Sequence, residues 1–161
     1  MKVKTIGILI ALCLTFTTCD KAMEDNFPEE YTTVLYFQEY GEIDINANDT
    51  KDEDMVYQLA ICKGGNQPQT TASAQIEVMS QEQLSEYNEN YMLLPSQYYT
   101  LSNTQLDFQK DEFYKTIDIS LKTTQIVHLL KGGNMYVLLL QLTVQKGNVN
   151  PDANQIYLRL K

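Results

Sequence analysis

The stretch Met135-Tyr-Val-Leu-Leu-Leu-Gln-Leu-Thr-Val-Gln145 is the most apolar part of the chain after its N-terminal segment. Aliphatic and aromatic residues dominate it, and the chain breaker Gly132-Gly133-Asn134 comes immediately before it. An apolar run next to a turn signal is typical of a strand in the interior of a sheet. The sequence therefore predicts a central strand over residues 135–145 that is buried on both faces for part of its length.

Further segments alternate between apolar and polar residues, which is the period of a half-buried strand. They are residues 33–40, 42–46, 55–63, 74–79, 105–108, 114–122 and 155–161. The alternation is most regular where Ile117, Ile119 and Leu121 fall on one face of the predicted strand. Residues 123–131 are predicted either as a strand edge or as a loop folded onto the core.

One helix is predicted between the strands. Ser80 and Gln83 have the spacing of a capping box, which fixes a helix start. Three apolar or aromatic residues then follow at spacings of three and four: Leu84, Tyr87 and Tyr91. About eight strands with turns between them and one short helix (about 80–91) indicate a mainly β protein. The expected fold is an antiparallel immunoglobulin-like β-sandwich of about 7–8 strands.

The N-terminal segment has the features of a targeting signal. Lys2 and Lys4 make a basic start, and the apolar run from Ile6 to Phe16 is about 11 residues long. That is too short to cross a hydrocarbon core of roughly 30 Å but suits a signal peptide. The residues before Cys19 resemble the lipobox of bacterial lipoproteins, although Phe16 stands where Leu is usual. The alternative is an ordinary secreted protein.

The lipobox resemblance, the polar and acidic composition after Cys19 and the strand pattern together predict three parts of the chain. Residues 1–18 are a lipoprotein signal peptide, residues 19–31 are a flexible tether anchored by lipid on Cys19, and residues 32–161 are a single β-sandwich domain. Acidic residues after Cys19 resemble the export signal of Bacteroidota surface lipoproteins, which implies a cell-surface site on the outer membrane. The net charge of −9 excludes nucleic acid as a partner.

The helix and the segment after it carry a family resemblance. A helix ending in N-x-x-Y is followed by L-P-x-x-x-Y, and the matching residues are Asn88, Tyr91, Leu94, Pro95 and Tyr99. This order resembles the β-sandwich domain of unknown function at the N-terminus of Bacteroidota surface lipoproteins. That family often precedes carbohydrate-binding, glycoside-hydrolase or acylhydrolase modules. The sequence ends right after its last predicted strand, so we expect no such module here.

The sequence offers no catalytic centre, no cofactor and no metal site that stands out. His128, the only histidine, lies among apolar residues and is interpreted as structural, and no Gly-x-Ser-x-Gly motif accompanies it. Asp44, Asn46 and Asn48 have the alternation of a calcium loop. Asp49 and Met55 stand where that loop needs Gly and Glu, so an acidic solvated loop is favoured.

The tyrosines are the candidate ligand-binding residues. The chain has 11 Tyr and no Trp, and phenol rings combine an apolar face with a polar hydroxyl. The adjacent Tyr98 and Tyr99 are the candidates, although tyrosines that only pack in the sandwich need no ligand. The favoured function is a non-catalytic surface lipoprotein, an accessory or glycan-binding module of a polysaccharide-acquisition system. The alternative is a structural or adhesive surface subunit that acts through contacts with other proteins.

Overall fold

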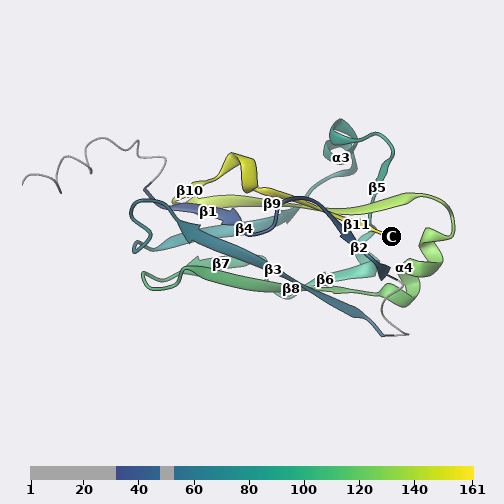
Figure 1. Cartoon of the computed structure of the whole chain (residues 1–161), viewed down its shortest axis with the longest axis horizontal. Helices are drawn as coiled ribbons and strands as arrows, with labels where there is room; N and C mark the ends of the chain where they lie inside the picture. The colour runs from purple at the N-terminus through teal and green to yellow at the C-terminus, as the bar shows by residue number, and fades with distance from the viewer. Residues whose placement is uncertain (1–31, 48–52) are drawn as a thin grey trace, which may run out of the picture.

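The computed structural model of the protein describes residues 32–47 and 53–161, which form two β-sheets packed face to face (Figure 1). The predicted signal peptide (1–18), Cys19, the tether (19–31) and Asn48 lie outside these residues. The first sheet has the strand order β10 (Asn148–Val149), β1 (Val34–Phe37), β3 (Met55–Gly64), β8 (Tyr114–Leu121) and β6 (Tyr99–Leu101). The second has the order β2 (Gly41–Ile45), β11 (Gln155–Leu160), β9 (Met135–Lys146), β4 (Ala72–Val78) and β7 (Gln105–Phe108).

The predicted β-sandwich is confirmed, with more short strands than the sequence indicates. β5 (Tyr91–Leu93) pairs with β9 beyond the end of β4, and β10 is a two-residue strand beside β1. Three pairs are parallel, namely β1 with β10, β2 with β11 and β5 with β9. Such short strands carry too few residues to show a period, so only their partners reveal them.

The first two predicted strands, residues 33–40 and 42–46, belong to different sheets, and the chain passes from one sheet to the other just before Gly41. β1 pairs with β3, whereas β2 pairs with β11 in the other sheet. Gly41 has a φ of 74°, in the left-handed region that glycine adopts without a Cβ clash. The chain can therefore turn sharply there and contribute to both sheets.

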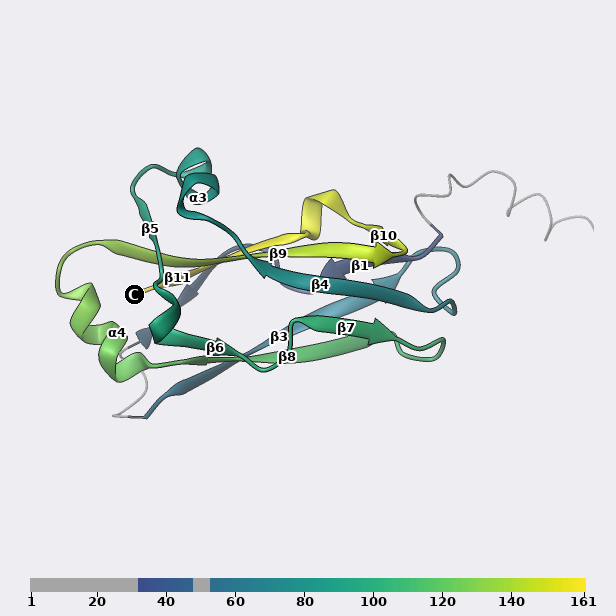
Figure 2. The ribbon, with the colours of Figure 1, turned by 180° about the vertical axis from the view of Figure 1, so that it is seen from behind.

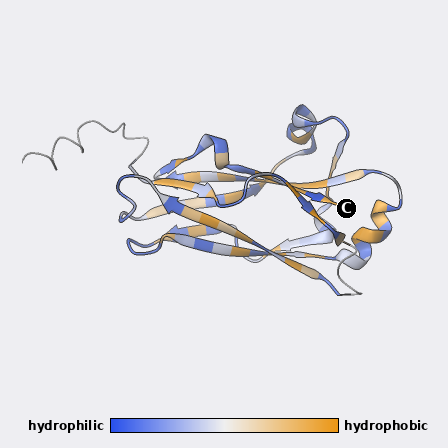
Figure 3. Cartoon of the chain, in the orientation of Figure 1, coloured by the Kyte–Doolittle hydropathy of each residue, from blue (hydrophilic) through white to orange (hydrophobic). Residues whose placement is uncertain are grey.

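β9 is the central strand, as its composition predicts. Residues 136–140 are buried, and Leu138, Leu140 and Leu142 lie in the main core between the sheets. The side chains of Val137 and Leu139 point to the opposite face of the sheet, where a second cluster covers them. Figure 3 shows apolar and polar residues alternating along the strands, and Figure 2 shows α3 (Gln81–Tyr87) standing on the outer side of this sheet.

The helix prediction is correct at its start and too long at its end. The capping box of Ser80 and Gln83 is formed, but α3 ends at Tyr87. Asn88 has extended backbone angles, and Tyr91 pairs with Met135 as the first residue of β5. Pairing with β9 satisfies the backbone of residues 91–93, and this competes with further helix at the same place.

A second helix, α4 (Thr123–Leu130), occupies the segment predicted as a strand edge or a loop, so that prediction is wrong. Ile126 is fully buried, and Val127, Leu129 and Leu130 pack against the core from the same helix. The Thr123 hydroxyl donates to the Glu53 carbonyl oxygen (2.6 Å) at the helix start. Such a short apolar run does not separate helix from strand by its period.

β3 ends at the opposite end of the sandwich from α4 (Figure 1), and Lys63, its last residue but one, is buried and only 3% exposed. Its ammonium donates to the carbonyl oxygens of Thr70 (2.8 Å), Gln109 (2.6 Å) and Lys110 (3.2 Å). It also lies 5.6 Å from the centre of the Phe113 ring, within the range of a cation–π contact. The lysine thus ties the β3–β4 turn to the β7–β8 turn.

Candidate functional site

The outer face of the second sheet carries a groove that depends on the position of α3. Leu84, the one buried residue of α3, is 0% exposed and packs with Val137 and Leu139 of β9. Gln81 fastens the helix to β5, because its Nε2 donates to the Tyr91 carbonyl (2.9 Å) and its Oε1 accepts from the Leu93 amide (2.6 Å). The helix is therefore held in a fixed place over the sheet, although it has only two turns.

Tyr87, the last residue of α3, presents one ring face to solvent. Its side chain is 51% exposed, while the ring stacks on Tyr157 of β11 with centroids 4.1 Å apart and planes at 27°. Tyr91 lies beside it, with centroids 6.4 Å apart. Burial first, and then the nearby Glu42 carboxylate, raise the pKa of Tyr87 above its ordinary value. The ring is thus exposed on one side and held in place on the other.

Beside this ring lies an open groove of about 280 Å³ between α3 and strands β9 and β11. Two aromatic and four polar side chains line it: Tyr87, Tyr157, Gln83, Glu86, Gln141 and Gln155. Met79 and Leu139 complete it with apolar surface. The Tyr157 hydroxyl donates to Gln155 Oε1 (2.9 Å), which orients that amide within the groove. Aromatic faces beside amide donors and acceptors are suited to a ligand that has an apolar face and several hydroxyl groups.

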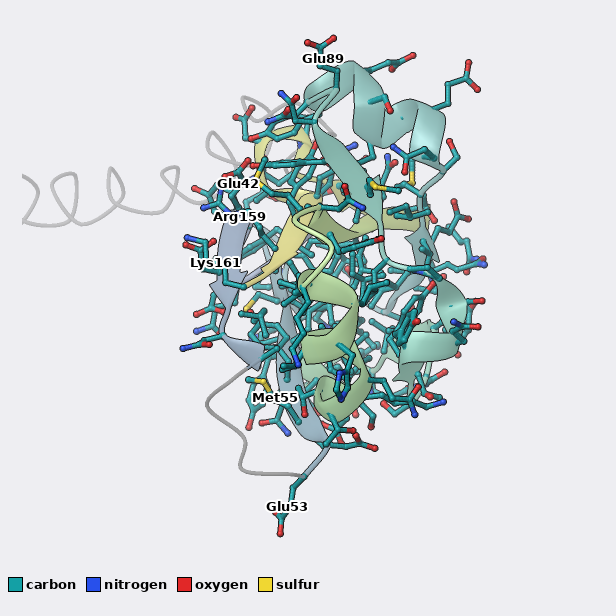
Figure 4. All side chains as sticks on the ribbon, turned by 90° about the vertical axis from the view of Figure 1, so that its right-hand side faces the viewer. Glu42, Glu53, Met55, Glu89, Arg159 and Lys161 are labelled. Carbon is teal, nitrogen blue, oxygen red and sulfur yellow. The ribbon has the colours of Figure 1, made fainter. Side chains whose placement is uncertain are left out.

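A charged network lies next to the groove, on strands β2 and β11. Arg159 pairs with Asp44 (2.6 Å) and Glu42 (3.0 Å), and Lys161 pairs with Asp44 (2.6 Å). The Tyr91 hydroxyl donates to Glu42 (2.7 Å) and accepts from Arg159 (3.0 Å). Figure 4 shows Glu42, Arg159 and Lys161 in a row on this side of the molecule. The network therefore holds β2, β5 and β11 together, and its cations are already paired with carboxylates.

Asp44, a candidate calcium ligand in the sequence, belongs to this network. Hydrogen bonds from Arg159 and then from Lys161 lower the pKa of Asp44 from 3.8 to about 2. Both carboxylate oxygens are thus used by cations of the chain itself. Asn46 follows β2 directly, and Asn48 lies outside the described residues. Residues 32–47 and 53–161 contain no group of three or more His, Cys, Asp or Glu side chains placed to hold a metal ion.

Tyr98 and Tyr99, the candidates from the sequence, lie elsewhere. Tyr98 ends a short 3₁₀ turn (η3, Ser96–Tyr98) and Tyr99 begins β6 in the first sheet. Both are half-buried and pack against the main core, and burial raises the pKa of Tyr99. The structure does not bring them to the groove at Tyr87. His128, which is interpreted from the sequence as structural, is exposed on α4.

The sequence contains a partial signal for the groove. The spacing of Leu84 and Tyr87 predicts that both lie on one face of an amphipathic helix. Tyr157 is far away in the sequence and lies on a strand that alternates like the others. Only the pairing of β11 with β9 places it under Tyr87. None of the helices in the described ranges is long and apolar enough to span a membrane.

The class of protein that the fold defines is a two-sheet β-sandwich domain, here with an aromatic groove on the outer face of one sheet. A family model for an N-terminal domain matches residues 29–149, which is more than half of the chain, and the chain belongs to that family. This agrees with the predicted family, the β-sandwich domain at the N-terminus of Bacteroidota surface lipoproteins. Comparison with curated proteins gives no match.

Solved structures from Bacteroides species share the fold at low sequence identity. A candidate carbohydrate-binding protein from Bacteroides ovatus has a TM-score of 0.64 and 20% identity, over 79% of this chain and 36% of that one. A protein of unknown function from the same species has a TM-score of 0.58 and 14% identity, over 83% and 46%. A two-domain protein of unknown function from Bacteroides fragilis has a TM-score of 0.59 and 13% identity, over 88% and 49%. The chain thus matches less than half the length of each of these proteins.

Proposed function

We propose that the protein is a non-catalytic, glycan-binding module of a polysaccharide-acquisition system, and that the groove beside Tyr87 and Tyr157 binds the glycan. The observation that carries the proposal is the Tyr87 ring, half exposed and stacked at 4.1 Å on Tyr157. The fold shared with a candidate carbohydrate-binding protein supports the same class of ligand. In this proposal Cys19 carries the lipid that anchors the protein at the surface of the outer membrane.

The fixed position of the Tyr87 ring favours binding. A pyranose ring has apolar C–H faces and a rim of hydroxyl groups, so it can stack on a phenol ring while its rim bonds to amides. A free surface side chain loses rotamer entropy when a ligand orders it, at a cost of about 0.5–1.5 kcal/mol. Tyr87 is already ordered by Tyr157 and by the neighbouring Glu42, so most of this cost is absent.

Charge favours neutral glycans over acidic ones. The groove includes the Glu86 carboxylate, and Glu42 lies near the Tyr87 hydroxyl. Arg159, the cation that pairs with Glu42, also pairs with Asp44 and is not free to bind another anion. With a net charge of −9, the protein repels uronic acids and sulfated sugars, most strongly at low ionic strength.

The groove does not have the parts of a glycosidase. Both retaining and inverting glycoside hydrolases generally place two carboxyl groups on either side of the bond to be cleaved. Among its lining residues Glu86 is the one carboxylate, and the other polar groups are amides and phenols. This supports binding without catalysis.

A structural or adhesive role would be favoured by a long apolar edge strand, onto which a partner strand could add. The edge strands of the described sheets are short. β10, β6 and β7 have two, three and four residues, and the five-residue β2 carries Glu42 and Asp44. Short and charged edges oppose strand addition, so this alternative has less support than glycan binding.

The test uses the chain with Cys19→Ser, which cannot be acylated, and neutral and acidic polysaccharides in affinity gels. Titration calorimetry then uses hexasaccharides of glucose, mannose, galactose and xylose. We expect at least one neutral glycan to bind, and Tyr87→Ala to weaken its binding at the groove tenfold or more, about 1.4 kcal/mol. Tyr40→Ala is the matched control, because Tyr40 is 55% exposed and does not line the groove.

Two results would contradict the assignment of the site. If the affinity for the glycan is unchanged in Tyr87→Ala but reduced in Tyr98→Ala or Tyr99→Ala, the binding site lies at Tyr98 and Tyr99, as the sequence predicts. No binding by a folded protein to any glycan would remove the proposed function itself.

A further inference from the structure

The outer face of the first sheet also carries aromatic and polar residues in regular rows. One row crosses strands β1, β3 and β8 through Tyr36, Cys62 and Tyr114, which are paired directly across the sheet. The side chain of Tyr114 is 70% exposed, the largest exposed fraction among the large apolar and aromatic residues of residues 32–47 and 53–161. Adjacent strands lie about 4.8 Å apart, so the two tyrosines of this row are about 10 Å apart at the backbone.

The next row contains a small residue and leaves a hollow beside Tyr114. Ala60 pairs with Thr116 on β8, and its carbonyl accepts a hydrogen bond from the Gln38 amide (2.9 Å). Gln58 follows two residues away on the same face of β3. These residues enclose an open hollow of about 290 Å³, which Tyr114 and Glu39 also line. Because the Ala60 side chain is a single methyl group, the surface at Ala60 lies lower than at the larger side chains around it.

The polar groups around the hollow are oriented by their neighbours. Gln58 Nε2 donates to Asp118 (3.2 Å), and Glu39 accepts from the Tyr57 hydroxyl (2.5 Å). A side-chain amide has two donor hydrogens and a carbonyl acceptor, so Gln58 keeps bonding capacity for a ligand. The hollow therefore combines an exposed phenol with an oriented amide.

We propose that this hollow is a second saccharide site, for a neutral sugar, on the face opposite the Tyr87 groove. The inference rests on the proposed function, because it assigns the same class of ligand to a second place. Glu39 and Asp118 lie at the site, so acidic sugars are disfavoured here too. The two sheets of a sandwich pack about 10 Å apart, and each site lies on an outer face. A short oligosaccharide cannot reach both sites at once, so one protein molecule bridges two glycan chains.

Bridging gives a property that a single site lacks. A protein with two sites binds an array of glycans more tightly than either site does, because the second contact is made at high effective concentration. It also links soluble polysaccharide chains into a network. A single-site protein binds those chains without linking them.

The test measures how many hexasaccharides bind to each protein molecule, with the Cys19→Ser chain and the neutral hexasaccharides named above. We expect two per molecule for the wild-type sequence and one per molecule for either Tyr114→Ala or Tyr87→Ala. Val56→Ala is the matched control, because Val56 is 58% exposed on the same face but does not line the hollow. Circular dichroism and the unfolding temperature confirm that each variant is folded. Turbidity with the matching polysaccharide should appear with the wild-type sequence and disappear with either Tyr variant.

The outcomes separate the two proposals. One hexasaccharide per molecule, lost in Tyr87→Ala and unchanged in Tyr114→Ala, overturns the second site and leaves the proposed function in place. If one hexasaccharide binds per molecule and only Tyr114→Ala abolishes this binding, the hollow remains a saccharide site. The same result overturns both the bridging and the site in the groove at Tyr87. Absence of binding in the wild-type sequence overturns the proposed function and this inference together.

Discussion

Replacement of Lys63 by methionine removes the buried ammonium and keeps an unbranched side chain of similar length. The stem can still pack near Phe108 and Phe113, whose ring centres lie 6.0 and 5.6 Å from the ammonium nitrogen. The three carbonyl oxygens of Thr70, Gln109 and Lys110 lose their common donor. The change therefore tests the connection between the two turns more than the packing of the core.

The expected cost follows from those three hydrogen bonds. A carbonyl deprived of its donor costs about 1–3 kcal/mol when it stays buried. Thr70, Gln109 and Lys110 are themselves exposed residues, so water can replace part of the lost bonding. Burial lowers the pKa of Lys63, opposed by Glu112 and Asp111, which shows that its charge is held at some cost. At about 1 kcal/mol for each carbonyl, we expect a loss of about 3 kcal/mol in the free energy of unfolding.

Urea unfolding followed by circular dichroism measures this loss, and thermal unfolding checks it. For a domain of this size, 3 kcal/mol corresponds to a fall of roughly 9–15 °C in Tm. Lys115→Met is the matched control. Lys115 also lies near the Phe108 ring (5.7 Å) but is half-buried and pairs with Glu112 (3.0 Å), and pairs of this kind contribute about 1 kcal/mol or less.

The reasoning is refuted if Lys63→Met is as stable as the wild-type sequence or more stable. That result would mean that desolvation of the ammonium outweighs its three hydrogen bonds. Equal losses in Lys63→Met and Lys115→Met would likewise show that burial of Lys63 makes no difference.

Two other changes test the second sheet. Leu84→Ala should lower the free energy of unfolding by about 2–3 kcal/mol, because Leu84 is fully buried under α3. It should also weaken glycan binding, because Tyr87 is then no longer held in place. The control Leu84→Met should lower the free energy of unfolding by less than about 1.5 kcal/mol. Urea unfolding and calorimetry measure both effects, and unchanged stability in Leu84→Ala would contradict the packing. The pKa of Asp44 is lowered from 3.8 to about 2, so its stabilising effect is complete above about pH 4 and is lost as the pH falls toward 2. Asp44→Asn should therefore reduce the dependence of Tm on pH between 4 and 2, and an identical slope in both proteins would speak against the ion pairs.

The local pattern of the sequence was sufficient for the fold class and for most long elements. The alternation in 114–122 predicts β8, the apolar run from Met135 predicts a strand buried on both faces, and Ser80 with Gln83 predicts the start of α3. In each case the signal lies within a few residues, and the physical cause, a side-chain period or a cap, acts over the same distance.

The tertiary structure decided the rest, because the remaining features join residues that are distant in the sequence. Residues 123–130 form a helix, although their short apolar run fits either period, and Tyr91 belongs to a strand instead of α3. Tyr98 and Tyr99 stood out as neighbours in the sequence, yet both pack against the core. Tyr87 meets Tyr157 only because β11 pairs with β9 below α3. A local sequence pattern shows which side of a helix or strand is apolar. Strand order and register decide which residues from distant parts of the chain its side chains contact.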